Sequence, residues 1–120
     1  MNEKRDLVPR TNEFARRVIR LYAALPKDTV SQVLGRQLLR SGTSVGANYR
    51  EANRGRSKAE FIAKIGDCLK EADETVYWLE LLRDEGRFPV ARLQPLVGEA
   101  NELVAIFVAI GKKAKEKVEG

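Results

Sequence analysis

Four arginines between positions 36 and 54 are the residues whose type and spacing bear most directly on chemistry. They are Arg36, Arg40, Arg50 and Arg54. In a helix that turns by about 100° per residue, they fall within roughly 80° of one another, opposite the apolar positions. A guanidinium is permanently charged and presents five N–H donors, which suits it to phosphates and carboxylates. This arginine face has three interpretations: a solvated outer surface, a contact for the phosphate backbone of RNA or DNA, and a set of salt bridges. We expect no exposed aromatic residues between the arginines, which argues against base stacking of single strands.

Four acidic residues further along the chain are candidate partners for these arginines: Glu60, Asp67, Glu71 and Glu74. Helical spacing places this acidic stripe away from the apolar positions. If the chain reverses at residues 55–57, Arg40 comes level with Glu71. The two sets of charges are then close enough in height to pair along the hairpin or across a subunit boundary. Such pairs would absorb charge otherwise available to nucleic acid, so both interpretations stay open.

The residues needed for catalysis are missing from the chain. There is no histidine, which removes Ser-His and Cys-His nucleophilic pairs and imidazole metal sites. The single cysteine, Cys68, falls on an apolar stripe and is expected to be a small buried hydrophobe. No glycine-rich phosphate loop is present. The sequence therefore predicts a protein that is not an enzyme and has no catalytic residues, metal or cofactor.

Length and composition indicate one ordinary domain over residues 1–120, with 43% hydrophobic and 32% charged residues. The longest apolar run covers residues 103–110, far below the roughly 18 residues of a membrane span, so we expect no membrane partner. The N-terminus lacks a secretory apolar stretch, and one cysteine suits a reducing compartment. The expected location is the cytoplasm.

Charge is unevenly distributed along the sequence. Residues 1–56 hold 12 Lys/Arg against 5 Asp/Glu, whereas residues 57–120 hold 10 against 12. A basic half beside a slightly acidic half indicates either a polyanion-binding surface or two faces that meet within or between molecules. The sequence does not decide between them.

Helical spacing of apolar residues recurs along the whole chain, and no stretch alternates as a strand would. We expect helices over residues 11–24, 28–54 and 58–84, and a fourth that begins close to Pro95, with residues 90–94 as an irregular turn. Expected N-terminal capping boxes are Thr29 with Gln32 and Ser57 with Glu60. Expected C-terminal stops are a left-handed Gly55 and Gly86. The second helix should bury Val30, Leu34, Leu38, Val45 and Ala52. Short connections between four amphipathic helices predict an all-α, up-down-up-down four-helix bundle.

Small and polar residues interrupt the second helix. Gly35, Gly42 and Gly46 each cost about 1 kcal/mol relative to alanine, which indicates the close approach of a neighbouring helix or of another protomer. Ser41 and Asn48 fall on the apolar stripe, and we expect Asn48 to be a hydrogen-bonded core amide that fixes helix register.

Two segments are more apolar than one bundle can cover. Tyr77, Trp78, Leu81 and Leu82 almost surround the end of the third helix, and residues 103–110, with Ile106 and Ile110, make the fourth apolar on all sides. A helix that is hydrophobic all round is normally buried all round. These six residues are therefore candidate contacts in a homo-oligomer.

Three runs of sequence resemble a known family. They are RSGTSVGANYREA at 40–52, SKAEF at 57–61 and LKEADETVYWLELL at 69–82. The chain is similar to bacterial four-helix-bundle proteins related to those encoded in intervening sequences of large-subunit ribosomal RNA genes. The resemblance implies an antiparallel bundle assembled into a ring-like pentamer and no enzymatic activity. Related accessory proteins of diversity-generating retroelements are pentameric and basic, and are thought to bind nucleic acid and a reverse transcriptase.

Together, the residues and the resemblance predict a homo-oligomeric binding module whose arginine face engages RNA or DNA, alone or with a partner protein. The alternative is a protein-interaction scaffold in which those arginines form salt bridges within or between subunits.

Overall fold

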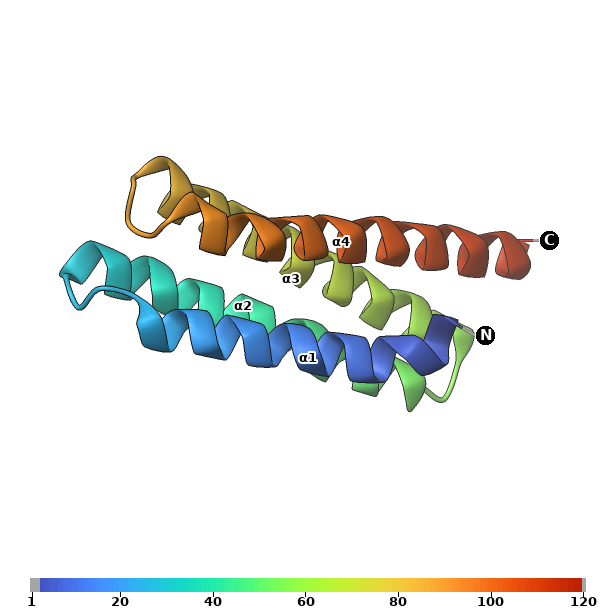
Figure 1. The fold of residues 1–120 in the computed structure, drawn as a ribbon. Helices are drawn as coiled ribbons and strands as arrows, with labels where there is room; N and C mark the ends of the chain where they lie inside the picture. Colours follow the sequence, from blue (N-terminus) through green and yellow to red (C-terminus); the bar gives the residue numbers. More distant parts are fainter. Residues whose placement is uncertain (1–2, 120) are drawn as a thin grey trace.

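The chain folds into four helices joined by short connections, in a computed structural model that describes the backbone of residues 3–119 and the side chains of residues 7–117. The helices are α1 (Glu3–Ala24), α2 (Thr29–Asn53), α3 (Lys58–Asp84) and α4 (Val90–Glu119). Figure 1 shows the chain reversing its direction between successive helices. No strand occurs within the described backbone, so the predicted all-α class is confirmed.

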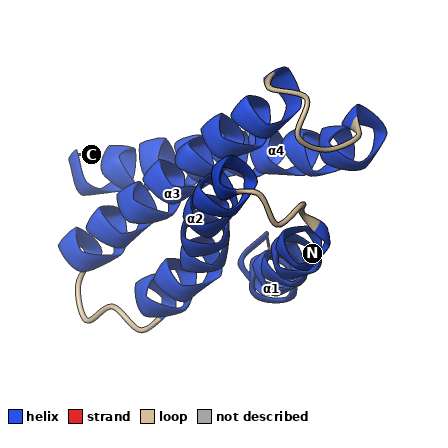
Figure 2. Ribbon diagram, turned by 90° about the vertical axis from the view of Figure 1, so that its left-hand side faces the viewer, coloured by secondary structure: helices blue, strands red, loops and turns tan. Residues whose placement is uncertain are grey.

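Successive helices are the ones that pack against each other. α2 and α3 have the most extensive contact, α3 with α4 and α1 with α2 follow, and α1 touches α4 only lightly. Figure 2 shows α1 lying beside α2, away from α3 and α4. The α2–α3 hairpin is therefore the centre of the fold, with α1 on one flank and α4 on the other.

A single ion-pair cluster links the two flanking helices among the described side chains. Arg10 of α1 donates from Nε and Nη2 to the two carboxylate oxygens of Glu99 in α4, at 2.8 Å each. A longer contact of 3.4 Å joins it to Glu102. The hydrogen bonds to Glu99, more than any other contact, raise the pKa of the Arg10 guanidinium above its already high usual value.

The hydrophobic core runs through all four helices and follows the predicted stripes. Phe14, Leu38, Leu79 and Phe107 are completely or almost completely buried, and removal of each such side chain from water stabilises the fold by roughly 1.5–3 kcal/mol. Val30 is an exception. It is 43% exposed because it lies in the first turn of α2, so its predicted burial is wrong.

Two helices begin earlier than predicted, each with a proline inside. α1 includes Pro9 and α4 includes Pro95. A proline removes one backbone hydrogen bond, but the residues before it belong to the core: Leu7 is 2% exposed and Leu93 is completely buried. That burial holds the first turns in the helical stripe. The expected starts at residue 11 and close to Pro95 are therefore wrong.

Asp28 starts α2, and not the predicted pair of Thr29 and Gln32. Its carboxylate accepts hydrogen bonds from the Ser31 backbone N–H at 3.0 Å and from the Ser31 hydroxyl at 2.8 Å. These bonds lower the pKa of Asp28, the backbone bond most, and the charge of Arg87 adds to the effect. Asp28 precedes the first helical residue with extended backbone, which is the geometry a capping side chain needs.

The start of α3 confirms half of its predicted capping box. Ser57 Oγ accepts from the Glu60 N–H at 3.1 Å, whereas the Glu60 carboxylate accepts from the N–H of Arg56, one residue earlier than expected, at 2.6 Å. Gly55 does not have the predicted left-handed conformation. Of the described residues only Gly86, after α3, has a positive φ, of 64°, so the second predicted stop is confirmed.

The segment Val90–Lys117 of α4 is long and apolar enough to cross a membrane, judged on length and composition alone, with a mean hydropathy of 1.4. A helix that lies in a protein core passes the same test. Here Leu93, Ala100 and Phe107 are fully buried against the rest of the bundle. The opposite side of α4 keeps exposed apolar residues, among them Val108 at 49%.

Candidate nucleic-acid interface

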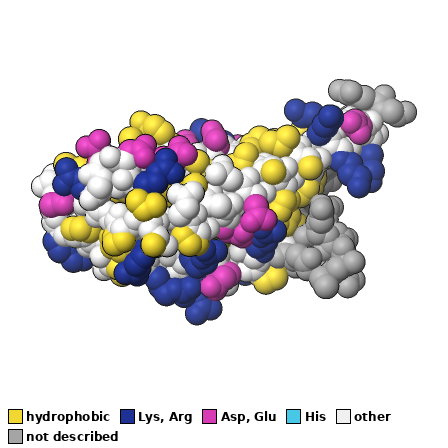
Figure 3. All heavy atoms as spheres, turned by 45° about the horizontal axis from the view of Figure 1, so that its top comes forward, with side chains coloured by type: hydrophobic (Ala, Val, Ile, Leu, Met, Phe, Trp, Pro, Cys, Tyr) yellow, Lys and Arg dark blue, Asp and Glu magenta, His cyan; other side chains and the backbone are white. Residues whose placement is uncertain are grey.

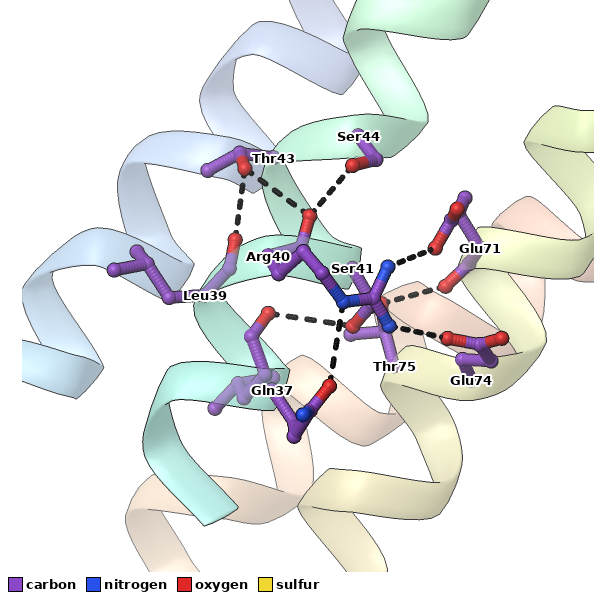
Figure 4. Close-up of polar contacts among 10 residues, drawn as sticks. Gln37, Leu39, Arg40, Ser41, Thr43, Ser44, Glu71, Glu74 and Thr75 are labelled. Atoms are coloured by element: carbon purple, nitrogen blue, oxygen red, sulfur yellow. Dashed lines mark hydrogen bonds and ion pairs between the residues drawn. The ribbon is translucent and has the colours of Figure 1, made fainter. Parts of the chain in front are cut away.

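Arg40 is the member of the arginine face that forms salt bridges. Its Nη1 lies 3.1 Å from Glu71 Oε1 and its Nη2 lies 2.5 Å from Glu74 Oε2, while Nε donates to Gln37 at 3.3 Å (Figure 4). The hydrogen bond to Glu74 is the largest cause of the raised pKa of the guanidinium. The predicted pairing of Arg40 with Glu71 along the hairpin is therefore confirmed, and it connects α2 to α3 within one chain.

The other two acids of the stripe have different partners. Glu60 is used at the start of α3, and Asp67 lies 3.8 Å from Lys64. Lys64 also pairs with Glu51 at 3.0 Å. The acidic stripe therefore neutralises one arginine of the four.

The remaining arginines, Arg36, Arg50 and Arg54, are exposed and form no ion pair with any side chain that the structure describes. They point to different surroundings. Arg50 lines a cavity of about 220 Å³ between α1 and α2, together with Asn12 and Thr43. Arg54 lines a hollow of about 480 Å³ at the α2–α3 turn. The structure thus separates the predicted row into one paired and three open guanidiniums.

Hydroxyl groups beside Arg40 are occupied by the backbone. Thr43 Oγ1 donates to the Leu39 carbonyl at 2.8 Å, and Ser44 Oγ donates to the Arg40 carbonyl at 2.7 Å (Figure 4). Bonds of this kind are usual for Ser and Thr inside helices. These side chains therefore serve the helix.

A buried hydroxyl pair joins α2 to α3 where a core asparagine was predicted. Thr75 Oγ1 donates to Ser41 Oγ at 2.9 Å, and both residues are fully buried. Asn48 is half-buried, so its placement in the core is wrong. Tyr49 takes that position, and burial raises the pKa of its hydroxyl. Thr75 was missed, although it lies next to Val76 on the inward side of α3.

The glycines of α2 contact α1 of the same chain. A Cβ atom at Gly35 would lie 2.6 Å from Leu25 Cδ1, one at Gly42 would lie 2.7 Å from Val18 Cγ2, and one at Gly46 would lie 3.2 Å from Thr11 Oγ1. Of the two predicted partners, a neighbouring helix or another protomer, the neighbouring helix accounts for all three glycines.

The predicted oligomer contacts fall into three groups. Tyr77 is 55% exposed. Trp78, Leu81, Ile106 and Ile110 are half-buried. Leu82 is fully buried in the core, because it lies on the inner side of α3, so its assignment to an interface is wrong.

Further apolar residues are open to solvent that the sequence did not single out. Ile19 is 48% exposed, Val33 46% and Val90 53%. On the face drawn in Figure 3, hydrophobic side chains lie open between acidic and basic ones. Trp78 adds a polar group to this surplus, because its buried Nε1 has no acceptor among the described residues.

Groups able to do chemistry are scarce within the described part of the chain. Cys68 is buried, and burial raises the pKa of its thiol to about 12, which leaves it un-ionised near neutral pH. No group of three or more His, Cys, Asp or Glu residues there is placed to hold a metal ion.

The fold and this site define the chain as a four-helix, all-α protein whose open functional groups are arginines and apolar side chains. A family described as "23S rRNA-intervening sequence protein" matches residues 3–109. The chain belongs to this family, which confirms the resemblance seen in its sequence.

A solved structure agrees with this assignment. The chain is similar to a protein with unknown function from the S23 ribosomal protein family of Bacteroides thetaiotaomicron VPI-5482, with 37% identity and a TM-score of 0.86 over 92% of this chain and 99% of that one. No curated protein matches the chain.

Proposed function

We propose that this protein is a non-enzymatic binding module of the cytoplasm that assembles with copies of itself and holds the phosphate backbone of RNA or DNA. The observation that carries the proposal is the state of Arg36, Arg50 and Arg54, which are exposed and form no ion pair with the described side chains. An open guanidinium on a basic protein can replace the counterions of a phosphate, and this exchange drives most non-specific binding to nucleic acid.

Arg40 has a different role in this proposal. Its two carboxylate partners already satisfy it, so a phosphate would have to displace Glu71 and Glu74. Arg40 therefore holds α2 against α3 and keeps the surface that carries the open arginines in place.

Assembly is the second part of the proposal. We propose an antiparallel up-down-up-down bundle that forms a ring-like pentamer, because Val33, Tyr77 and Val108 remain exposed in one copy. A ring of five requires a contact between two different surfaces of the same chain. A ring would also repeat the open arginines several times around one particle, and a partner protein can add to the contact.

The Arg40 pair supports a second candidate, a protein-interaction scaffold without affinity for nucleic acid. Here the open arginines pair with carboxylates of neighbouring copies, as Arg40 does within one copy. Replacement of these arginines would then weaken assembly.

The decisive experiment measures affinity for a labelled nucleic-acid duplex between about 50 and 200 mM salt, with particle mass measured by light scattering. Each phosphate contact contributes about 0.9 to the slope of log affinity on log salt. The double variant Arg36→Gln with Arg50→Gln should lower the slope by about 1.8 per engaged subunit and leave the mass unchanged. No binding by the wild type at the lowest salt would refute the proposal. A smaller particle in the variant would favour the scaffold.

A further inference from the structure

We infer that the nucleic-acid contact is centred on one end of the molecule, where the α2–α3 turn and the last turns of α4 form one basic surface for the phosphodiester backbone of a duplex. This basic end comprises residues 50–64 and 112–117. The inference rests on the proposed function and places it at a surface that includes Arg50 and Arg54 but extends beyond the arginine face.

The two segments of the basic end are far apart in sequence and close in space. Figure 1 shows the α2–α3 turn and the C-terminal end of α4 at the same end of the molecule. A Cβ atom on Gly111 would lie 3.6 Å from Ile65 Cγ2. Lys112 and Lys115 line the same groove as Ile62. The lysines of α4 therefore lie beside the first turns of α3.

The basic end accounts for the entire net charge of the chain. Residues 50–64 hold five Lys/Arg and two Asp/Glu, and residues 112–117 hold four and one, which gives a local net charge of +6. The whole chain has +5, so all remaining residues together carry −1. A field concentrated in this way at one end of a molecule 51 Å long orients an approaching polyanion toward that end.

Most of these cations are free to meet a phosphate. Lys64 pairs with Glu51 and Asp67, whereas the other eight form no ion pair with the described side chains. Arg56 lies between two hollows of about 350 and 480 Å³, and its own helix-capping contact uses only its backbone N–H.

The dimensions of this end suit a duplex. Across its short axes the molecule extends 23 and 20 Å, and the major groove of B-form DNA is about 12 Å wide. A surface of this width can contact phosphates on both sides of a groove.

Stabilisation of helix ends does not account for the whole cluster. α2 and α4 both end here, and Arg50 and Lys117 in their last turns favour the helix dipoles. Arg56 and Lys58, however, flank the start of α3, where the dipole disfavours cations. An external anion explains their presence at that position.

The test compares two double variants that lose the same charge. Arg56→Gln with Lys115→Gln changes the basic end and leaves the arginine face intact. Arg16→Gln with Lys27→Gln changes exposed residues of α1 and of the α1–α2 connection and is the matched control. Affinity for labelled duplex RNA and duplex DNA is measured as a function of salt, with unfolding midpoint and particle mass as checks on the fold. The two duplexes distinguish the sources of the backbone.

We expect the basic-end variant to lower the salt slope by about 1.8 per engaged subunit, a loss on the order of tenfold in affinity per contact at about 0.1 M salt. The control should stay close to the wild type. Equal loss in both variants would overturn the inference, because binding would then follow net charge alone. Wild-type-like binding by the basic-end variant, with weakening by Arg36→Gln and Arg50→Gln, would overturn it and leave the proposed function standing. A wild type that binds neither duplex would refute the proposed function itself.

Discussion

Replacement of Gly42 by alanine should destabilise the protein, although alanine is the better helix former. The new methyl group would lie 2.7 Å from Val18 Cγ2, 2.9 Å from Cγ1 and 3.1 Å from Cβ. Val18 is completely buried, and a β-branched side chain in a helix has one strongly preferred rotamer. The obstacle therefore cannot turn away, and α1 must move from α2.

The magnitude follows from two opposing effects. Alanine gains about 1 kcal/mol over glycine inside a helix, whereas overpacking of a core costs roughly 1–3 kcal/mol. Because three atoms of one fixed side chain are in the way, we expect the upper end of that range and a net loss of about 2 kcal/mol. Gly66 is the matched control. It also lies inside a helix, but a Cβ atom there meets nothing within 4 Å, so Gly66→Ala should gain about 1 kcal/mol.

Urea unfolding followed by circular dichroism, at one protein concentration for all variants, measures both changes. The two substitutions are chemically identical, so the difference of about 3 kcal/mol between them reports the contact of α2 with α1. If Gly42→Ala were as stable as Gly66→Ala, the close seating of α1 on the glycines of α2 would be wrong.

Three further results are expected. Thr75→Val should cost about 1–2 kcal/mol by leaving the buried Ser41 hydroxyl without its partner, and the addition of Ser41→Ala should recover part of that loss in urea unfolding. The lowered pKa of Asp28 contributes stability above the carboxyl's ordinary pKa of 3.8 that is lost as pH falls through the lowered value. Asp28→Asn should therefore flatten the acid limb of a stability–pH curve, and an unchanged limb would contradict the cap. Cys68, with its thiol pKa of about 12, should react with a disulfide reagent at pH 8 only at the rate of unfolding, and rapid reaction of the native protein would mean that the thiol is open to solvent.

Local signals predicted the helices where punctuation and burial agree. α3 has its predicted bounds, because Ser57 begins it and Gly86 follows it. The starts of α1 and α4 could not be found in this way. Pro9 and Pro95 disfavour a helix locally, and only the burial of Leu7 and Leu93 in the folded core overrides them.

The candidate site was predicted in part for a similar reason. A reversal at residues 55–57 was enough to place Arg40 beside Glu71. It was not enough to decide between Glu60 and Arg36 as partners, because helix capping already uses Glu60. The union of residues 50–64 with residues 112–117 depends on the length and direction of α3 and α4 together, which no local pattern contains.

The slight contact between α1 and α4 has a consequence for how the chain reaches its native state. Nearly all packing is between helices that follow each other in sequence, so no long loop has to close before contacts form. Low contact order of this kind gives folding in microseconds to milliseconds. Collisions between folded chains depend on concentration and are slower at low concentration. If the protein assembles as proposed, dilution should slow the appearance of the complete particle while leaving the rate of helix formation unchanged.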